Sequence, residues 1–291
     1  MIETKPQDGV LDPRSFEAIA ELAYRESGLQ LVAEKTSMIQ SRLRHRLRDL
    51  GLPNFRDYVA FVCSDAGQPE RRHMISALTT NVSHFFREKH HFDILSERIA
   101  PVLSKKLLAG GRVRLWSAGC SNGQEACSIA MCLLEAIPDL SRYDLRILGT
   151  DIDPKVVAFA NAAVYPERMI TGVPPAMLDK YFERRTDGAE PEYAARPVLR
   201  DLTRFRELNL HGPWPVRQAM DTIFCRNVVI YFDLPTQNAL WPRFRKLLTG
   251  NGHLFLGHSE RIANPEAAGF VTAGPTTYRT DPAILPAPTA N

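Results

Sequence analysis

The chain has 291 residues, of which 44% are hydrophobic and 24% charged, and its formal net charge is +3. This composition is that of an ordinary soluble globular protein, long enough for two modest domains or for one α/β domain with an appendage. The charge is too small to indicate nucleic-acid binding by itself. No apolar run is long enough to cross a membrane, and the N-terminus lacks the apolar core of a signal peptide. We therefore expect a cytoplasmic protein without membrane insertion.

Residues 12–80 carry apolar side chains at helical spacing. Ile39, Leu43 and Leu47 follow one another at four-residue steps, and no segment reads as a strand. We predict a small all-α domain over residues 12–80. A further helical pattern predicts a linking helix over residues 81–110.

Strand and helix patterns alternate from residue 111 to residue 280. Strands are predicted at 112–119, 145–151, 221–227 and 252–259, with helices at 125–137, 154–164 and 235–248. Such alternation predicts a doubly wound, Rossmann-like α/β sheet. Residues 166–203 interrupt it with Pro, Gly and charged residues, and we predict a small antiparallel β insertion there.

The first candidate binding motif is a glycine loop between a strand and a helix. Gly119 and Gly123 are followed by Glu125, in the pattern Gly-x-x-x-Gly-x-Glu. Glycine allows close approach of a ligand to the backbone at this edge of an α/β sheet. An acid at the helix start opposes a diphosphate but suits a ligand with an ammonium and a sulfonium group, such as S-adenosylmethionine. The alternative is that the glycines only turn the chain and Glu125 favours the helix start.

Polar residues follow two other predicted strands. Asp151 ends one strand, where an acid can accept hydrogen bonds from both hydroxyls of a ribose, while Asp153 is expected to cap the next helix. Arg226 and Asn227 end another strand, and Tyr231 follows on the next turn. The alternative for this second group is a strand-end turn with a packed tyrosine.

These motifs together resemble the CheR-type chemotaxis receptor methyltransferases. The similar stretches run in the family's order over residues 12–280, and they are LTTNVSHFFRE, LWSAGCSNGQE, GTDID, RELNL, IFCRNVVIYFD and LFLGHSE. The resemblance implies transfer of a methyl group from S-adenosylmethionine to receptor glutamates, giving γ-methyl esters and S-adenosylhomocysteine. By this resemblance the cofactor contacts are Asn81, Ser83, Arg87, Gly119, Glu125, Asp151, Asn209, Leu210, Arg226 and Asn227. Arg87 and Tyr231 are implied to lie beside the methyl group.

Two residues depart from the family's pattern. Ser83 stands where threonine is common, and its hydroxyl preserves the expected contact. Gln124 replaces an acid of the glycine loop, which is expected to weaken cofactor binding without abolishing it.

The proposed chemistry needs no general base, because a glutamate carboxylate with an ordinary pKa of about 4.3 is already ionised at neutral pH. The sequence shows no Ser-His-Asp or Cys-His set. Its five cysteines form no Cys-x-x-Cys pair, which indicates reduced thiols and no metal site.

Receptor docking has two candidate surfaces. Arg42, Arg44 and Arg48 lie off the apolar stripe of a predicted helix, and the resemblance implies that this basic helix meets the glutamate-rich cytoplasmic helices of methyl-accepting chemotaxis receptors. The alternative is a solvated helix face. In some family members the β insertion binds a receptor C-terminal peptide as an added strand, and the sequence leaves this open here.

Two other functions remain as alternatives. One is a methyltransferase that acts on a small molecule or RNA, although the basic stripe lacks the exposed aromatic residues typical of nucleic-acid binding. The other is a non-enzymatic scaffold, which the intact glycine loop, Asp151, Arg87 and Tyr231 disfavour.

Overall fold

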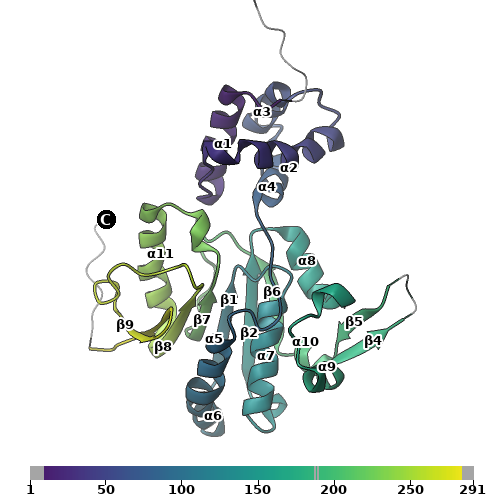
Figure 1. The fold of residues 1–291 in the computed structure, drawn as a ribbon. Helices are drawn as coiled ribbons and strands as arrows, with labels where there is room; N and C mark the ends of the chain where they lie inside the picture. The colour runs from purple at the N-terminus through teal and green to yellow at the C-terminus, as the bar shows by residue number, and fades with distance from the viewer. Residues whose placement is uncertain (1–9, 187, 189, 284–291) are drawn as a thin grey trace, which may run out of the picture.

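The computed structural model describes residues 10–186, 188 and 190–283. A helical bundle at the N-terminus sits over one end of a large sheet, and a small sheet projects from the side (Figure 1). In these parts of the chain, no helix combines the length and the apolar character that crossing a bilayer requires.

The N-terminal bundle has four helices: α1 (Pro13–Ser27), α2 (Thr36–Asp49), α3 (Phe55–Cys63) and α4 (Gln68–Leu78). Helix α1 begins at Asp12, whose carboxylate accepts two backbone N–H groups, and ends at Gly28 in the left-handed conformation. The predicted apolar stripe of Ile39, Leu43 and Leu47 is buried in the core of the bundle. The expected all-α region is confirmed.

The linking segment is helical only in part. The structure has α5 (Lys89–Ile94), a π-helical turn (Leu95–Ile99) and α6 (Ala100–Leu108). The predicted helix over residues 81–110 is therefore wrong for residues 81–88. Phe86 and Glu88 have φ angles of 53° and 57°, which a right-handed helix does not allow, and the Phe86 N–H donates to the Ser128 hydroxyl instead of to a helical carbonyl.

The large sheet has seven strands: β1 (Val113–Ala118), β2 (Leu145–Asp151), β6 (Thr203–Glu207), β7 (Met220–Cys225), β8 (Leu248–Leu256), β9 (Phe270–Gly274) and β10 (Thr277–Thr280). Their order is β6-β2-β1-β7-β8-β10-β9, in which the first five are parallel and the last two pair antiparallel. The predicted strands all form. The patterns of β6, β9 and β10 had not indicated strands, because these are short segments in which polar and charged residues interrupt the apolar ones.

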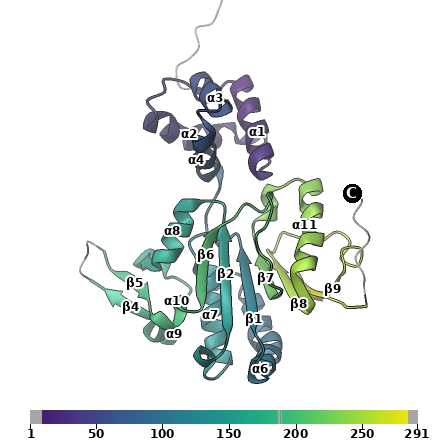
Figure 2. The same cartoon turned by 180° about the vertical axis from the view of Figure 1, so that it is seen from behind.

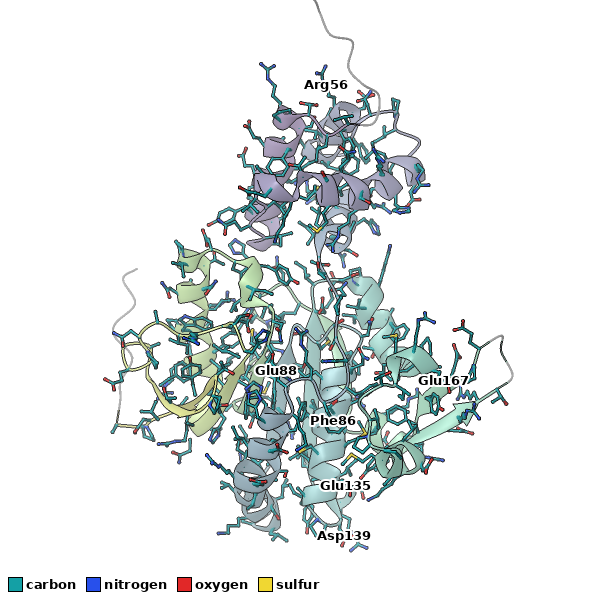
Figure 3. All side chains as sticks on the ribbon, in the orientation of Figure 1. Arg56, Phe86, Glu88, Glu135, Asp139 and Glu167 are labelled. Atoms are coloured by element: carbon teal, nitrogen blue, oxygen red, sulfur yellow. The ribbon has the colours of Figure 1, made fainter. Side chains whose placement is uncertain are left out.

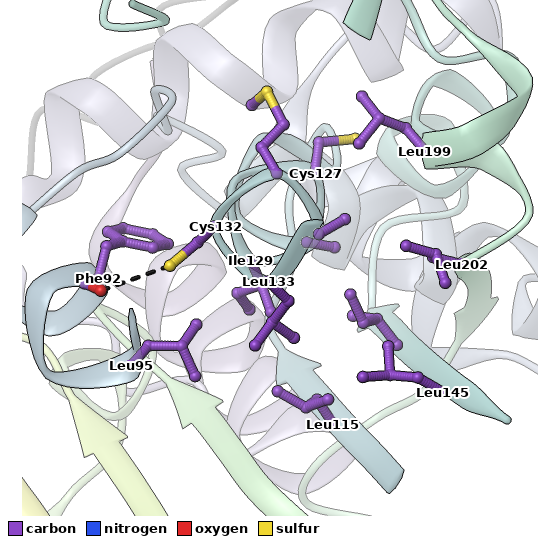
Figure 4. Close-up of a cluster of buried hydrophobic side chains, with 14 of the residues drawn as sticks. Phe92, Leu95, Leu115, Cys127, Ile129, Cys132, Leu133, Leu145, Leu199 and Leu202 are labelled. Atoms are coloured by element: carbon purple, nitrogen blue, oxygen red, sulfur yellow. Dashed lines mark hydrogen bonds between the residues drawn. The ribbon is translucent and has the colours of Figure 1, made fainter. Parts of the chain in front are cut away.

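Helices cover both faces of this sheet. Helices α5, α6 and α7 (Gln124–Ala136) lie on one face, and α11 (Leu234–Leu247) lies on the other (Figures 1 and 2). Ile129 and Leu133 of α7 pack toward the sheet residues Leu115 and Leu145 (Figure 4). The predicted doubly wound fold is confirmed, with an antiparallel edge added.

The β insertion is also confirmed. It contains β3 (Val164–Pro166), α9 (Pro175–Tyr181), β4 (Phe182–Arg185), β5 (Glu192–Ala195) and α10 (Pro197–Arg200). The strand order is β3-β5-β4, and both pairings are antiparallel. Strand β4 is therefore an edge of this small sheet.

The strand order fixes where a ligand is expected. Strand β1 lies between β2 and β7, and the chain leaves it toward β2 through α7 and returns on its other side at β7. In open α/β sheets such a reversal opens a crevice at the carboxyl ends of the strands. Here the helical bundle lies over the carboxyl ends of these strands (Figure 1).

Candidate active site

A cavity lies at the carboxyl ends of β1, β2 and β7, between the sheet and the N-terminal bundle. Its wall contains all the residues that the sequence indicated for the cofactor and for catalysis, which are Asn81, Ser83, Arg87, Gly119, Glu125, Asp151, Asn209, Leu210, Arg226, Asn227 and Tyr231. These residues come from five separate segments of the chain. The structure brings the whole predicted set together, and the role of each residue stays a prediction.

The glycine loop turns the chain from β1 into α7. Gly119 and Gly123 have φ angles of 85° and 82°, so another residue type would be strained at either position. A Cβ atom at Gly119 would lie 2.2 Å from Cγ2 of Val228, and one at Gly123 would lie 2.9 Å from the Ala160 Cβ. The absent side chain at Gly119 thus makes room for Val228, which itself lines the cavity.

A buried charge cluster forms part of the cavity wall. The Arg226 guanidinium, 2% exposed, pairs at 3.1 Å with both the Glu125 and the Glu88 carboxylates. Glu125 also accepts the Ser117 hydroxyl at 2.6 Å. Burial raises the pKa of Glu125, and the positive charge of Arg226 opposes that rise. One guanidinium between two carboxylates leaves a formal charge of −1, which suits a ligand ammonium group.

Asp151 ends β2 with its carboxylate at the cavity wall. Its Oδ2 accepts the Ser121 N–H at 2.8 Å and its Oδ1 accepts the Asp153 N–H at 3.1 Å. Burial raises its pKa, against these backbone hydrogen bonds. Each carboxylate oxygen can accept a second hydrogen bond, so the two oxygens remain able to bind a ribose diol. Asp153 caps α8 (Pro154–Ala162), as predicted.

The segment that carries Asn81 and Arg87 runs along the cavity without forming a helix or a strand, and its residues 85–88 are turns and bends. Asn81 donates to Asp153 at 2.7 Å, and its carbonyl accepts the Ser121 hydroxyl. The Arg87 guanidinium donates to the Asn227 side-chain oxygen at 2.9 Å and to the Val82 carbonyl at 3.1 Å. Arg87 is thereby held against the end of β7, at the wall of the cavity.

Tyr231 and Asn209 connect the sheet to the bundle. The Tyr231 hydroxyl donates to the Thr80 carbonyl at 3.4 Å, a long hydrogen bond that a better acceptor can replace. Its own carbonyl accepts the Gln30 N–H at 2.9 Å. Asn209 donates to the Glu26 carbonyl at 2.7 Å, so its amide nitrogen serves the domain contact.

Sequence reasoning missed several residues of the site. Glu88 lies at the start of α5, in the middle of the molecule (Figure 3), and it pairs with Arg226. Burial of Glu88 opposes its ionisation, but Arg226, His258 and Asn227 together lower its pKa to about 2. His84 lines the cavity, and burial followed by the charges of Arg87 and Arg226 lowers its pKa. Both residues belong to the stretch LTTNVSHFFRE, so their membership of this motif could have indicated a role at the site.

Gln124 lies away from the cavity wall. Its side chain is buried and donates to the Met169 carbonyl at 2.9 Å, toward the β insertion. It does not belong to the cavity wall. The departure from the family's acid at this position therefore adds no direct loss of charge to the wall.

The three docking arginines are not equivalent. Arg42 donates to the carbonyls of Leu78 and Thr79 at 2.7 and 2.9 Å, and to the Thr80 hydroxyl at 2.8 Å. It thus holds the end of α4 and the start of the cavity wall. Arg44 and Arg48 are exposed on α2, and Arg48 lies 2.6 Å from Nδ1 of His45.

The wall of the cavity fits the parts of S-adenosylmethionine. Glu125 carries a negative charge, Asp151 a pair of acceptor oxygens and Arg87 a positive charge, while Ile152 and Val228 add apolar surface. Which of these groups binds the ammonium group, the ribose or the carboxylate of the cofactor stays a prediction. An α/β sheet with these groups at the carboxyl ends of its strands is the arrangement expected of a methyltransferase that uses S-adenosylmethionine.

Comparisons with known proteins identify the family. Residues 81–277 match the SAM-binding domain of CheR methyltransferases, and residues 14–79 match their all-alpha domain. A probable chemotaxis protein methyltransferase of Rhizobium etli is 45% identical over 89% of this chain and 96% of its own length. The chemotaxis protein methyltransferases of Borreliella burgdorferi and Escherichia coli are 34% and 36% identical, over 90% and 92% of this chain and 92% and 91% of theirs. The chain belongs to the CheR methyltransferase family.

Proposed function

We propose that this protein esterifies glutamate side chains on the cytoplasmic helices of chemotaxis receptors. The names of its relatives support the receptor as the substrate class. The observation that carries the chemistry is the presence of Arg87 and Tyr231 at one cavity, where a guanidinium and a hydroxyl held only by a long hydrogen bond come from positions 144 residues apart. Both groups can bind a carboxylate.

The residues of the site perform binding and positioning. A glutamate carboxylate is ionised at neutral pH and needs no base to become a nucleophile. When bound, S-adenosylmethionine supplies an activated methyl group. Arg87, held by Asn227, carries the positive charge that orients the carboxylate of the cofactor. The Tyr231 hydroxyl donates one hydrogen bond to the acceptor glutamate. Holding the two reactants in line contributes about 7–11 kcal/mol in favourable cases.

Receptor docking is proposed on helix α2 through Arg44 and Arg48, which are exposed on the bundle above the cavity. Cationic side chains there suit glutamate-rich helices, whose charges guide association. The edge strand β4 provides a second surface, because its backbone pairs on one side with β5 and is open to an added strand on the other.

The test of the reaction is a transfer assay with radiolabelled S-adenosylmethionine and a receptor cytoplasmic fragment. We expect protein-bound label that dilute base releases as methanol, since esters are cleaved and N-methyl groups are not. A fragment with its acceptor glutamates changed to alanine is the control. Base-stable label, or label transferred to RNA or to a small molecule instead, would contradict the proposal.

The test of docking is a double charge reversal, Arg44→Glu with Arg48→Glu. It should raise the receptor concentration needed for half-maximal rate and reduce the salt dependence, while cofactor affinity stays unchanged. The matched control is Arg112→Glu with Arg142→Glu, two exposed arginines near the amino ends of β1 and β2. Equal effects of the two double variants would show that α2 has no specific role.

A further inference from the structure

The stretch LFLGHSE ends in a buried carboxylate that the site described so far does not use. Glu260 is 3% exposed, and its two oxygens accept four backbone N–H groups. Oε2 accepts from Gly257 at 2.6 Å and from Asn227 at 2.8 Å. Oε1 accepts from Val228 at 2.8 Å and from Ile230 at 3.2 Å. Three of the four donors belong to the loop that follows β7.

The backbone conformation of that loop needs a partner from outside the loop to stabilise it. Asn227 has a φ angle of 59°, in the left-handed region, and Val228 is right-handed. Successive N–H groups in such a pair point the same way and form a concave site for an anion. A left-handed residue other than glycine is unfavourable unless its surroundings hold it. Here the anion is a side chain of the same protein.

A second observation concerns how closely the two segments approach. A Cβ atom at Gly257 would lie 2.7 Å from the Asn227 nitrogen and 2.8 Å from Oε2 of Glu260. Any side chain at this position would separate the end of β8 from the loop after β7. Glycine at position 257 therefore permits the hydrogen bonds that Glu260 accepts, and the two residues together hold the end of β8 against the loop after β7.

The loop held in this way carries the functional side chains. Arg226, Asn227, Val228 and Tyr231 all line the cavity. The Asn227 side chain accepts from Arg87 and donates to Glu88, and Tyr231 follows one turn later in a 3₁₀ turn (Val229–Tyr231). The direction of these side chains depends on the backbone that Glu260 binds.

We propose that Glu260 is a positioning residue for methyl transfer: its carboxylate fixes the 226–231 loop so that Asn227 and Tyr231 face the bound reactants. This inference rests on the proposed function for its activity readout. Glu260 itself does not line the cavity, so its effect reaches the reaction only through the loop.

Glu260→Gln is the sharpest test. The amide has almost the same volume as the carboxylate, but one of its ends is an NH₂ donor. Two of the four backbone N–H groups then lose their acceptor and face another donor, whichever way the amide is turned. We expect turnover to fall by about 10- to 100-fold, since displacement of a reacting group by about 1 Å has such an effect. Glu266→Gln, an exposed change in the same segment, is the matched control and should be silent.

A double-variant cycle separates positioning from a general loss of structure. If Glu260 acts in part through Tyr231, adding Glu260→Gln to Tyr231→Phe should lower turnover less than Glu260→Gln does in the parent, by up to the roughly 2- to 10-fold effect of the hydroxyl itself. Effects that multiply independently would overturn the inference, as would turnover of Glu260→Gln within about twofold of the parent.

Two further measurements cover the remaining outcomes. Gly257→Ala keeps every hydrogen-bonding group but forces the end of β8 away from the loop after β7, and it should reduce turnover as well. If both Gly257→Ala and Glu260→Gln fail to fold, Glu260 has a general structural role and the positioning role is overturned. If the parent does not methylate receptor fragments, the proposed function fails. The affinity for S-adenosylhomocysteine then tests the loop alone, with a loss of about tenfold in Glu260→Gln supporting the inference and an unchanged value refuting it.

Discussion

Asp151 gives the clearest quantitative test of the cofactor site. Its carboxylate is 8% exposed at the end of β2 and lines the cavity. Hydrogen bonds to a charged group contribute about 1.5–3 kcal/mol each. If Asp151 binds the ribose, each ribose hydrogen bond lost in Asp151→Ala should weaken S-adenosylhomocysteine binding by about 10- to 150-fold, because each 1.4 kcal/mol is a factor of ten.

The assay is isothermal calorimetry with S-adenosylhomocysteine and with its 2′-deoxy analogue. The parent should distinguish the two ligands, whereas Asp151→Ala should bind them almost equally, since the acceptor for the missing hydroxyl is gone. This comparison cancels any general loosening caused by the lost hydrogen bonds to Ser121 and Asp153. A folded Asp151→Ala variant with parental affinity, or with undiminished discrimination, would refute the assignment.

Lower pH gives an independent check of the same residue. Burial raises the pKa of Asp151 above its ordinary value of 3.8. A ribose contact that needs the carboxylate is therefore lost as the pH falls through that raised pKa. We expect the affinity of the parent to fall in acid more than the affinity of Asp151→Ala.

The remaining predictions concern three other residues. Tyr231→Phe should keep cofactor affinity and lower turnover by about 2- to 10-fold, the effect of one hydrogen bond; parental turnover in a steady-state assay would remove the hydroxyl from the reaction. The pKa of Glu88 is lowered to about 2 beside Arg226, so its ionisation stabilises the fold above pH 4.5, and that contribution is lost as the pH falls from 4.5 toward 2. The difference in melting temperature between the parent and Glu88→Gln should accordingly shrink as the pH falls through this interval. A constant difference would contradict a stabilising role for the ionised Glu88. Arg42→Ala should lower the free energy of unfolding by about 1–3 kcal/mol, measured with denaturant, because the carbonyls of two residues lose a charged donor; an unchanged midpoint would show that these hydrogen bonds contribute nothing.

The sequence identified most of the site because of one geometric rule. The carboxyl ends of parallel strands meet at one edge of a sheet, so polar residues after separate strands converge even when they are far apart in the chain. Asp151 and Arg226 illustrate this, since each follows an apolar strand that periodicity alone indicates. The helices of the bundle were equally readable, because Ile39, Leu43 and Leu47 show a helical repeat that depends on no distant residue.

Only the tertiary structure decided the features that depend on partners distant in sequence. Residues 81–88 have a helical pattern, yet they form no helix because the Phe86 N–H bonds to Ser128 and the Asn81 side chain bonds to Asp153. Likewise, a glutamate 33 positions beyond Asn227 fills the anion site of its loop. Local periodicity reports which face of an element is buried, but it carries no information about which distant group satisfies a particular N–H or carboxylate. That pairing exists only once the chain has folded.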